Sequence, residues 1–231
     1  MNSQFEYYYN NVPGKGLCRN NLIYTSLINK DKTVFCKWYY NDTEYHQGQN
    51  EVVDPDKMEE KWEREVKFLT RMEKEFSIHV PNIIDIDYTN KKIFFEIEGV
   101  DFWEQAGCVQ EEFNNVLPNW QDQMLDIIQA HKDIGIYKYS MHPSSYFLVA
   151  GKLKSINYFF CYDKDEPGIT VGSILSHISE DRRKELLPKM ESMGIEMNTI
   201  ADLNLLQHLC FNSFSNNYPE DFIEKAKSIY K

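Results

Sequence analysis

The sequence lacks several features that would place it in a specialised class of protein. Its five cysteines are scattered singly with no C-x-x-C spacing, so nothing indicates a zinc site or a disulfide framework. No uncharged apolar run approaches the ~18 residues that a membrane-spanning helix needs, and residues 1–11 lack the basic and apolar regions of a secretory signal. There is no internal repeat. We therefore expect a cytoplasmic protein with reduced thiols and no membrane partner.

Positive charge is also scarce, since 25 basic side chains against 36 acidic ones give a formal net charge of −11. A chain of this charge has no general attraction for a phosphate backbone, so nucleic acid is not an expected partner. Apolar and aromatic residues are plentiful, with 42% hydrophobic residues that include 14 Phe and 15 Tyr. This composition excludes a disordered chain, and 231 residues suffice for one large domain or two small lobes.

The first hundred residues predict a small antiparallel sheet and one long helix. Asp54 and Pro55 are typical of a helix start, and apolar residues then recur at helical spacing as far as Phe76, while Glu and Lys occupy the other face. Stretches rich in β-branched and aromatic residues before and after this helix predict two pairs of strands, each joined by a polar turn. The predicted strands cover residues 22–28, 33–40, 83–88 and 92–98.

The remaining residues predict mainly helices. One face of residues 120–134 is apolar, and Gly135 follows where a left-handed residue would end a helix. Short apolar runs on either side of residues 151–152 predict a hairpin, and Pro219 predicts the start of a terminal helix. The predicted hairpin strands are 146–150 and 153–160, and the other helices are 180–187 and 200–211. The fold class is therefore α+β, with a β-rich domain at 1–99 and a helical domain at 100–231.

The order of these elements, together with three motifs, resembles the protein-kinase-like superfamily. Lys37 ends the run Val-Phe-Cys-Lys on the second predicted strand, and Glu65 lies on the long helix. Glu96 and Glu98 fall in residues 95–99, which look like the hinge between two lobes. The resemblance implies a two-lobed fold in which Lys37 pairs with Glu65 beside nucleotide phosphates, while the hinge backbone meets an adenine, so ATP is the implied cofactor.

The segment that resembles the catalytic loop departs from the family pattern. Residues 129–136 are similar to the helix end that precedes this loop, but Ser140 stands at the position of the catalytic base. Ser145 stands at a metal-ligand position, and Asn157 replaces the metal-binding aspartate of the next motif. Magnesium prefers anionic oxygen ligands, so these neutral side chains predict weak metal binding.

Three hypotheses follow from this pattern. The leading one is a pseudokinase that has lost metal-dependent phosphotransfer and acts as a protein-binding regulator or scaffold. The alternative is an active phosphotransferase or nucleotidyltransferase in which Asn157 recruits a metal together with Asp163 or Asp165. In the third, the resemblance is accidental and the chain is simply an α+β domain. Its size and Asn-rich composition suggest a phage or viral origin, which would place it in a host cytoplasm.

Other candidate residues have ordinary structural explanations. The G-x-G of residues 14–16 is more typical of a turn than of a phosphate-binding loop. His142 could accept a proton, but a histidine that is exposed, or whose hydrogen bonds are satisfied within the fold, is an equally good interpretation. Four aromatic side chains crowd the region where the phosphates of a nucleotide would lie and could fill it. These are Tyr146, Tyr158, Phe159 and Phe160.

Overall fold

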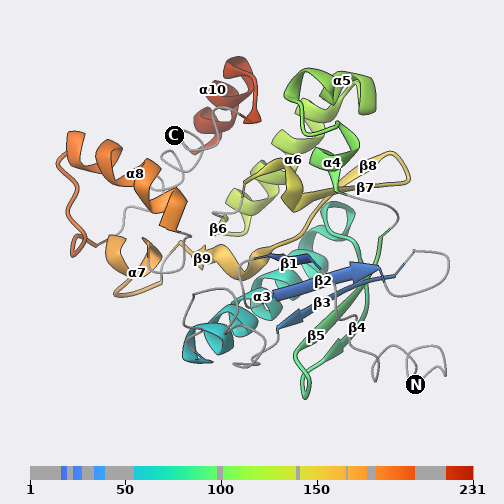
Figure 1. The fold of residues 1–231 in the computed structure, drawn as a ribbon, viewed down its shortest axis with the longest axis horizontal. Helices are drawn as coiled ribbons and strands as arrows, with labels where there is room; N and C mark the ends of the chain where they lie inside the picture. Colours follow the sequence, from blue (N-terminus) through green and yellow to red (C-terminus); the bar gives the residue numbers. More distant parts are fainter. Residues whose placement is uncertain are drawn as a thin grey trace. The chain divides into compact units, whose positions relative to one another are not determined.

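The chain combines helices with small antiparallel sheets, which confirms the predicted α+β class (Figure 1). The structure is a computed structural model that describes residues 17–19, 23–27, 34–39, 55–97, 101–138, 141–164, 166–175, 180–200 and 217–230. It divides into two compact units, Met1–Glu63 with Pro81–Val100, and Arg64–Val80 with Asp101–Lys231. The domain boundary predicted at residue 99 stays a prediction. Within the described ranges, no helix has the length and apolarity needed to cross a bilayer.

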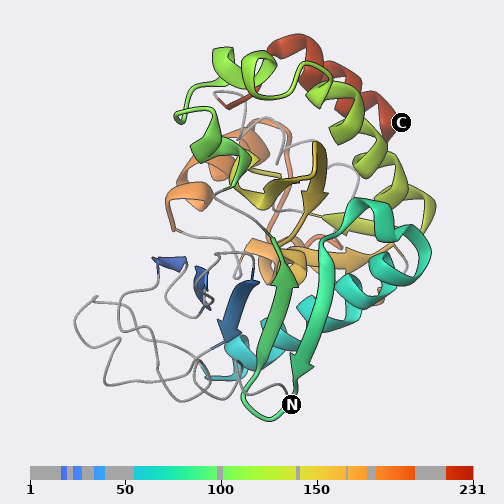
Figure 2. The same ribbon diagram turned by 90° about the vertical axis from the view of Figure 1, so that its right-hand side faces the viewer.

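The first unit contains a five-stranded antiparallel sheet with the strand order β1-β2-β3-β5-β4. Figure 2 shows β3, β5 and β4 side by side. The four predicted strands are present, but β1 was not predicted, because three residues are too few to show an alternating pattern. The described part of the chain before the long helix therefore contains three strands, where the sequence predicts two. The strands are β1 (Leu17–Arg19), β2 (Ile23–Leu27), β3 (Val34–Tyr39), β4 (Asn82–Asp87) and β5 (Lys92–Glu96).

Alternate residues of β3 contribute to two different faces of this sheet. Phe35 packs on Phe95 of β5, with ring centroids 6.3 Å apart, and both rings are buried. On the other face, Cys36 and Phe94 form a small buried cluster. The burial of Cys36 raises the pKa of its thiol to about 12, which makes it an unreactive core residue. The sheet is thus covered on both faces at β3 and β5.

Helix α3 (Pro55–Phe76) is amphipathic, as its sequence predicts. Its buried residues recur every three or four positions, which places them on one face. Trp62 packs edge-on against Tyr39 of β3, with ring centroids 5.5 Å apart. The buried residues of the helix are Met58, Lys61, Trp62, Glu65, Phe68, Leu69 and Met72. Residues up to Glu63 belong to the first unit and those from Arg64 onwards to the second.

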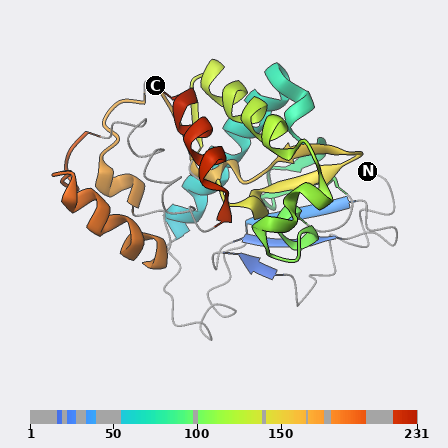
Figure 3. The same cartoon turned by 90° about the horizontal axis from the view of Figure 1, so that it is seen from above.

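The second unit has a core of aromatic and aliphatic side chains between short helices. Helix α6 (Trp120–Asp133) confirms the helix predicted at 120–134, and Gly135 follows it with a φ of 67°. Helix α10 (Glu220–Ile229) begins directly after Pro219 and packs along α6, as Figure 3 shows. Among the residues that the structure describes, the other helices of this unit are α4 (Phe102–Gln105), α5 (Phe113–Val116), α7 (Val171–Leu175) and α8 (Glu180–Ser192), with 3-10 turns η2 (Ser77–His79), η3 (Gln110–Glu112), η4 (Pro143–Ser145) and η5 (Tyr158–Phe160).

Two short antiparallel strand pairs complete the second unit. Strands β7 (Tyr146–Val149) and β8 (Lys152–Ser155) form the predicted hairpin, but its second strand ends at Ser155 rather than at residue 160. Asn157 takes a left-handed conformation with a φ of 66°, which ends the extended chain and starts η5. Strand β6 (Ile136–Lys138) pairs with β9 (Cys161–Asp163).

Helix α8 is longer than predicted. The sequence predicts an end before Pro188, yet the helix continues to Ser192. Pro188 is exposed, so the hydrogen bond that a proline removes from a helix can be replaced by water. The helix predicted at 200–211 lies outside the described residues, apart from Ile200, which forms an isolated bridge with Thr170.

Candidate functional site

The structure describes some of the predicted site residues and not others. Lys37 is fully buried on β3, with Nζ 5.5 Å from the centroid of the Tyr39 ring. Lys37 belongs to the first unit and Glu65 to the second, so their pairing stays a prediction. Glu96 is exposed at the end of β5, where its carboxylate accepts a hydrogen bond from Asn82 Nδ2 at 2.9 Å. Ser140, Glu98, Asp165 and residues 14–16 lie outside the described residues.

Two residues predicted at metal-ligand positions do come together. Asn157 Nδ2 donates a hydrogen bond to Ser145 Oγ at 3.0 Å. Ser145 is buried at the end of η4, where its main-chain oxygen accepts a bond from Ile156 N at 2.9 Å. The two side chains are therefore held by each other and by the hairpin that joins them. Both are neutral, so the pair brings no negative charge to a cation.

A buried lysine also bonds the main chain of this pair. Lys138 is fully buried on β6, and its ammonium donates a hydrogen bond to the main-chain oxygen of Asn157 at 2.9 Å. The same ammonium lies 5.3 Å from the centroid of the Tyr158 ring, a cation–π distance. Lys138 therefore fixes the backbone at the point where it turns into the left-handed conformation.

His131 and Tyr158 form a second buried contact beside Lys138. His131 Nε2 lies 3.1 Å from the Tyr158 hydroxyl, and both residues are fully buried. Burial holds the pKa of His131 well below its usual value, and the charge of Lys138 lowers that pKa further. Burial also raises the pKa of Tyr158 well above its usual value. The pair is therefore neutral at pH 7.

Glu65 joins the long helix to this cluster. Its Oε2 accepts a hydrogen bond from the main-chain nitrogen of Phe159 at 2.7 Å, and the carboxylate is fully buried. The aromatic residues that were expected to crowd this region are buried too: Tyr146, Tyr158 and Phe159. The side chain of Phe160 lies outside the described residues. The cluster thus consists of buried polar contacts among buried aromatic side chains.

These contacts suit holding the chain in place better than metal-assisted chemistry. Among the described residues, no group of three or more His, Cys, Asp or Glu side chains is arranged to bind a metal ion. Asn157 and Ser145 offer a cation only neutral oxygens, which magnesium accepts less readily than carboxylates. Asn157 and Ser145 alone therefore offer a magnesium ion no carboxylate, and Asp165 lies outside the described residues.

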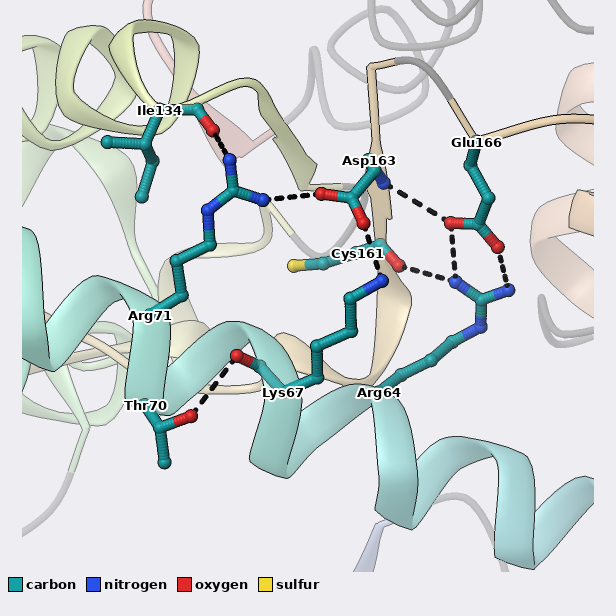
Figure 4. A network of polar contacts seen from close by, with 8 residues as sticks. All are labelled: Arg64, Lys67, Thr70, Arg71, Ile134, Cys161, Asp163 and Glu166. Atoms are coloured by element: carbon teal, nitrogen blue, oxygen red, sulfur yellow. Dashed lines mark hydrogen bonds and ion pairs between the residues drawn. The ribbon is translucent and has the colours of Figure 1, made fainter.

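A second cluster, which we call the α3 ion cluster, is formed by three cations of helix α3 and two carboxylates from residues 163–166. It consists of Arg64, Lys67, Arg71, Asp163 and Glu166 (Figure 4). Arg64 binds both carboxylate oxygens of Glu166, at 2.7 and 3.1 Å, and also donates to the main-chain oxygen of Cys161 at 3.1 Å. Its guanidinium lies 4.4 Å from the centroid of the Tyr162 ring. The two bonds to Glu166 have the bidentate geometry that arginine forms with carboxylates.

Asp163 receives the other two cations of the α3 ion cluster. One of its oxygens accepts from Lys67 Nζ and the other from Arg71 Nη1, both at 2.5 Å, and Arg71 also bonds the main-chain oxygen of Ile134. Partial burial acts to raise the pKa of Asp163, but its bonds to Lys67 and Arg71 outweigh this, and the pKa lies below its usual value. With both oxygens engaged, Asp163 is poorly placed to serve as the metal ligand considered from the sequence.

The sequence did not predict the role of the three cations. Charged residues on the face of a helix opposite its apolar face are usually solvated, so the pattern alone predicts no further role for them. A signal was present, since Arg64, Lys67 and Arg71 are spaced i, i+3 and i+7 and so share one face. Lys138 was also missed, although a lysine directly after Ile136 and Tyr137 is unusual in a buried strand.

Comparisons with known proteins add little to this picture. Neither protein-family models nor curated proteins match the chain. Among solved structures, the co-crystal structure of WbdD with the kinase inhibitor LY294002 is similar to it at 14% sequence identity, with a TM-score of 0.45. The match covers 84% of this chain and 44% of the WbdD chain. A likeness this distant assigns neither the fold nor the activity of the chain.

Proposed function

We propose that the chain is a kinase-like pseudokinase that lacks metal-dependent phosphotransfer and works as a protein-binding regulator. The observation that carries this proposal is the hydrogen bond between Asn157 and Ser145. These two residues stand at the metal-ligand positions implied by the family resemblance, and they bond each other through neutral groups.

The order of the elements supports the kinase-like part of the proposal. A five-stranded antiparallel sheet interrupted by one long helix comes first, and a largely helical unit with the β7–β8 hairpin follows. The resemblance drawn from Lys37, Glu65 and the degenerate loop implies the same sequence of elements. This comparison concerns the order of helices and strands within each unit and not the placement of one unit against the other.

The chemistry of the loop supports the loss of activity. Phosphoryl transfer depends almost entirely on positioning and on neutralising the charge of the phosphates. Replacing an anionic ligand by Asn157 and an amide ligand by Ser145 removes part of that neutralisation, and Ser140 cannot accept a proton as an aspartate does. A regulator needs a folded surface and no turnover, so these replacements leave that role intact.

Thermal unfolding tests the proposal. The purified protein is heated with ATP, ADP or GTP, each with and without magnesium or manganese. A ligand present at about 100 times its dissociation constant stabilises the native state by ~2.7 kcal/mol, which shifts the midpoint clearly. We expect no shift that requires metal. A metal-dependent shift that disappears in Lys37→Ala would favour the active phosphotransferase or nucleotidyltransferase instead.

A restored variant sharpens the test. The triple replacement Ser140→Asp, Ser145→Asn and Asn157→Asp rebuilds the polar set that the family resemblance implies. If the neutral residues are what prevents metal binding, this variant gains a metal-dependent nucleotide shift that the natural protein lacks. The matched control is Ser144→Asn, which changes the neighbouring half-buried serine and leaves the predicted metal-ligand positions unchanged.

A further inference from the structure

In the α3 ion cluster, three cations that could bind an acidic ligand are already paired with carboxylates of the same chain. Three cations on one helix face meet two carboxylates that lie three residues apart, at 163 and 166. Arg64 takes one carboxylate in bidentate fashion, and Lys67 and Arg71 share the other. The cluster therefore shows directly which ligand chemistry this helix face accepts, namely a pair of oxyanions on a short stretch of backbone.

The turn that carries the two carboxylates starts at Asp163, the last residue of β9, which pairs with Ile136 of β6, and beyond Asp163 it has little apolar attachment. Lys164, Pro167 and Gly168 are exposed, and the next buried side chain towards the C-terminus is Ile169. A main-chain bond from Lys164 N to Gly135 O, at 2.9 Å, adds one contact. The more exposed pairs of Lys67 and Arg71 with Asp163 each contribute only about 0–1 kcal/mol, whereas the less exposed, bidentate pair of Arg64 with Glu166 contributes more. The two carboxylates can therefore release the cations at a small cost compared with unfolding the core of the unit, while Asp163 keeps its main-chain pairing with β6.

Two of the three cations are accessible to a partner, while the side chain of Arg64 is only 14% exposed. The side chains of Lys67 and Arg71 are 54% and 39% exposed. Both line a concave site with a volume of about 650 Å³, whose charged lining also includes Lys164 and the carboxylates of Glu75, Asp133, Asp163 and Glu166. Asp163 and Glu166 are the carboxylates that bond the cations, so they are the ones that a partner would have to displace. A peptide segment that displaced the turn would find the cations already arranged on one rigid helix face.

We propose that this face of α3 binds an acidic segment of a partner protein, and that Asp163 and Glu166 occupy the site in its absence. The proposal rests on the proposed role of the chain as a protein-binding regulator and names the surface that would serve it. An occupant tethered in the same chain acts at an effective concentration on the order of millimolar. A partner segment must therefore carry more negative charge than the two internal carboxylates in order to displace them.

Removing the internal occupant should strengthen binding of an acidic probe. The double variant Asp163→Asn/Glu166→Gln keeps the three cations and removes their competitor. The probe is a fluorescein-labelled hexaglutamate peptide, and its binding is followed by fluorescence anisotropy at low ionic strength, where charge interactions are least screened. We expect the double variant to bind at least ~10-fold more tightly than the natural protein, because the site no longer has to be vacated.

A matched control separates this effect from a change in net charge. Asp221→Asn/Glu224→Gln alters the net charge equally and removes two exposed carboxylates that pair with Lys225 and Lys227 on α10. We expect little gain in this variant. Adding Lys67→Ala and Arg71→Ala to the first double variant should return the affinity to that of the natural protein. An equal gain in the α10 variant, or a gain that survives the loss of Lys67 and Arg71, would overturn the proposal.

A measurement on the natural protein avoids the risk that a variant misfolds. Hydrogen exchange of the amides in 163–168 is followed with and without excess hexaglutamate. Faster exchange in the presence of the peptide is the expected result, since displacement frees the turn, and unchanged exchange at saturating peptide contradicts it. The nucleotide experiment has a separate readout. A metal-dependent nucleotide shift would refute the pseudokinase without altering these results, and a failure of hexaglutamate binding would leave the pseudokinase standing.

Discussion

Lys138 and Asn157 are linked by a hydrogen bond from a fully buried ammonium group to a main-chain oxygen, at 2.9 Å. The acceptor belongs to the residue whose left-handed conformation ends the β7–β8 hairpin and begins η5. The lysine side chain therefore fixes a change of backbone direction, and Asn157 in turn bonds Ser145. The contribution of these contacts to the free energy of unfolding can be measured by replacing the residues one at a time.

Replacing Lys138 by methionine should destabilise the protein. The substitution keeps an unbranched side chain but leaves the oxygen of Asn157 without this donor, which costs about 1–3 kcal/mol. The free energy of unfolding from urea titration measures the loss. Lys152→Met on β8 is the control, because Lys152 is exposed and its replacement should change the stability by less than about 0.5 kcal/mol. Equal stability of the two variants would contradict the assigned role of Lys138.

Two substitutions at Asn157 should separate backbone strain from the loss of its side-chain bond. Both Asn157→Gly and Asn157→Ala lose the bond to Ser145, but only alanine is strained at a φ of 66°. Alanine should therefore be the less stable variant by roughly 1 kcal/mol. Urea titration of both variants measures the difference. If alanine were as stable as glycine, the left-handed conformation would not be required at this position.

The stability of the protein should fall on mild acidification because of His131. Its pKa in the folded protein lies well below the usual value, so the unfolded chain takes up a proton first as the pH falls below about 6.5. Stability is therefore complete above this pH and decreases below it. The unfolding free energy measured between pH 7.5 and 5 should show a smaller slope for His131→Gln. A residual slope is expected from His79, whose pKa is also lowered by partial burial.

Arginine should be required at position 64 for its geometry as well as its charge. Arg64→Lys keeps the charge but loses the two parallel bonds to Glu166 and the stacking on Tyr162. We expect a loss of about 0.5–1.5 kcal/mol in the unfolding free energy. Arg183→Lys on α8 is the matched conservative change. A loss at Arg64 no larger than that at Arg183 would show that the bidentate contact contributes nothing.

The repeating patterns in the sequence predicted the regular elements well. Met124, Ile127 and Ile128 mark the buried face of α6, and all three are fully buried. The stretches rich in β-branched and aromatic residues, each pair joined by a polar turn, similarly predicted strands β2, β3, β4 and β5. Local periodicity is visible in any window of sequence, because it depends on neighbours within the same element.

The contacts that join distant segments were not predictable in the same way. Arg64 and Glu166 are 102 positions apart, and each is an ordinary charged residue in its own surroundings. Asn157 predicted the loss of a metal ligand through the family resemblance, but its left-handed backbone and its bond to Lys138 depend on the packing of β6 beneath η5. The spacing of residues within one element shows which side chains share a face, but it does not show which distant residues they will contact.

The division of helix α3 between the two units has a consequence for how the protein can be taken apart. The second unit takes Arg64–Val80 from the N-terminal part of the chain, including the buried residues Phe68, Leu69 and Met72. The first unit resumes at Pro81 and continues to Val100. No single cut in the polypeptide therefore releases either unit whole. A fragment that begins at Asp101 would lack these three apolar side chains, so neither unit is an independent module that could be exchanged between proteins by a simple fusion at one junction.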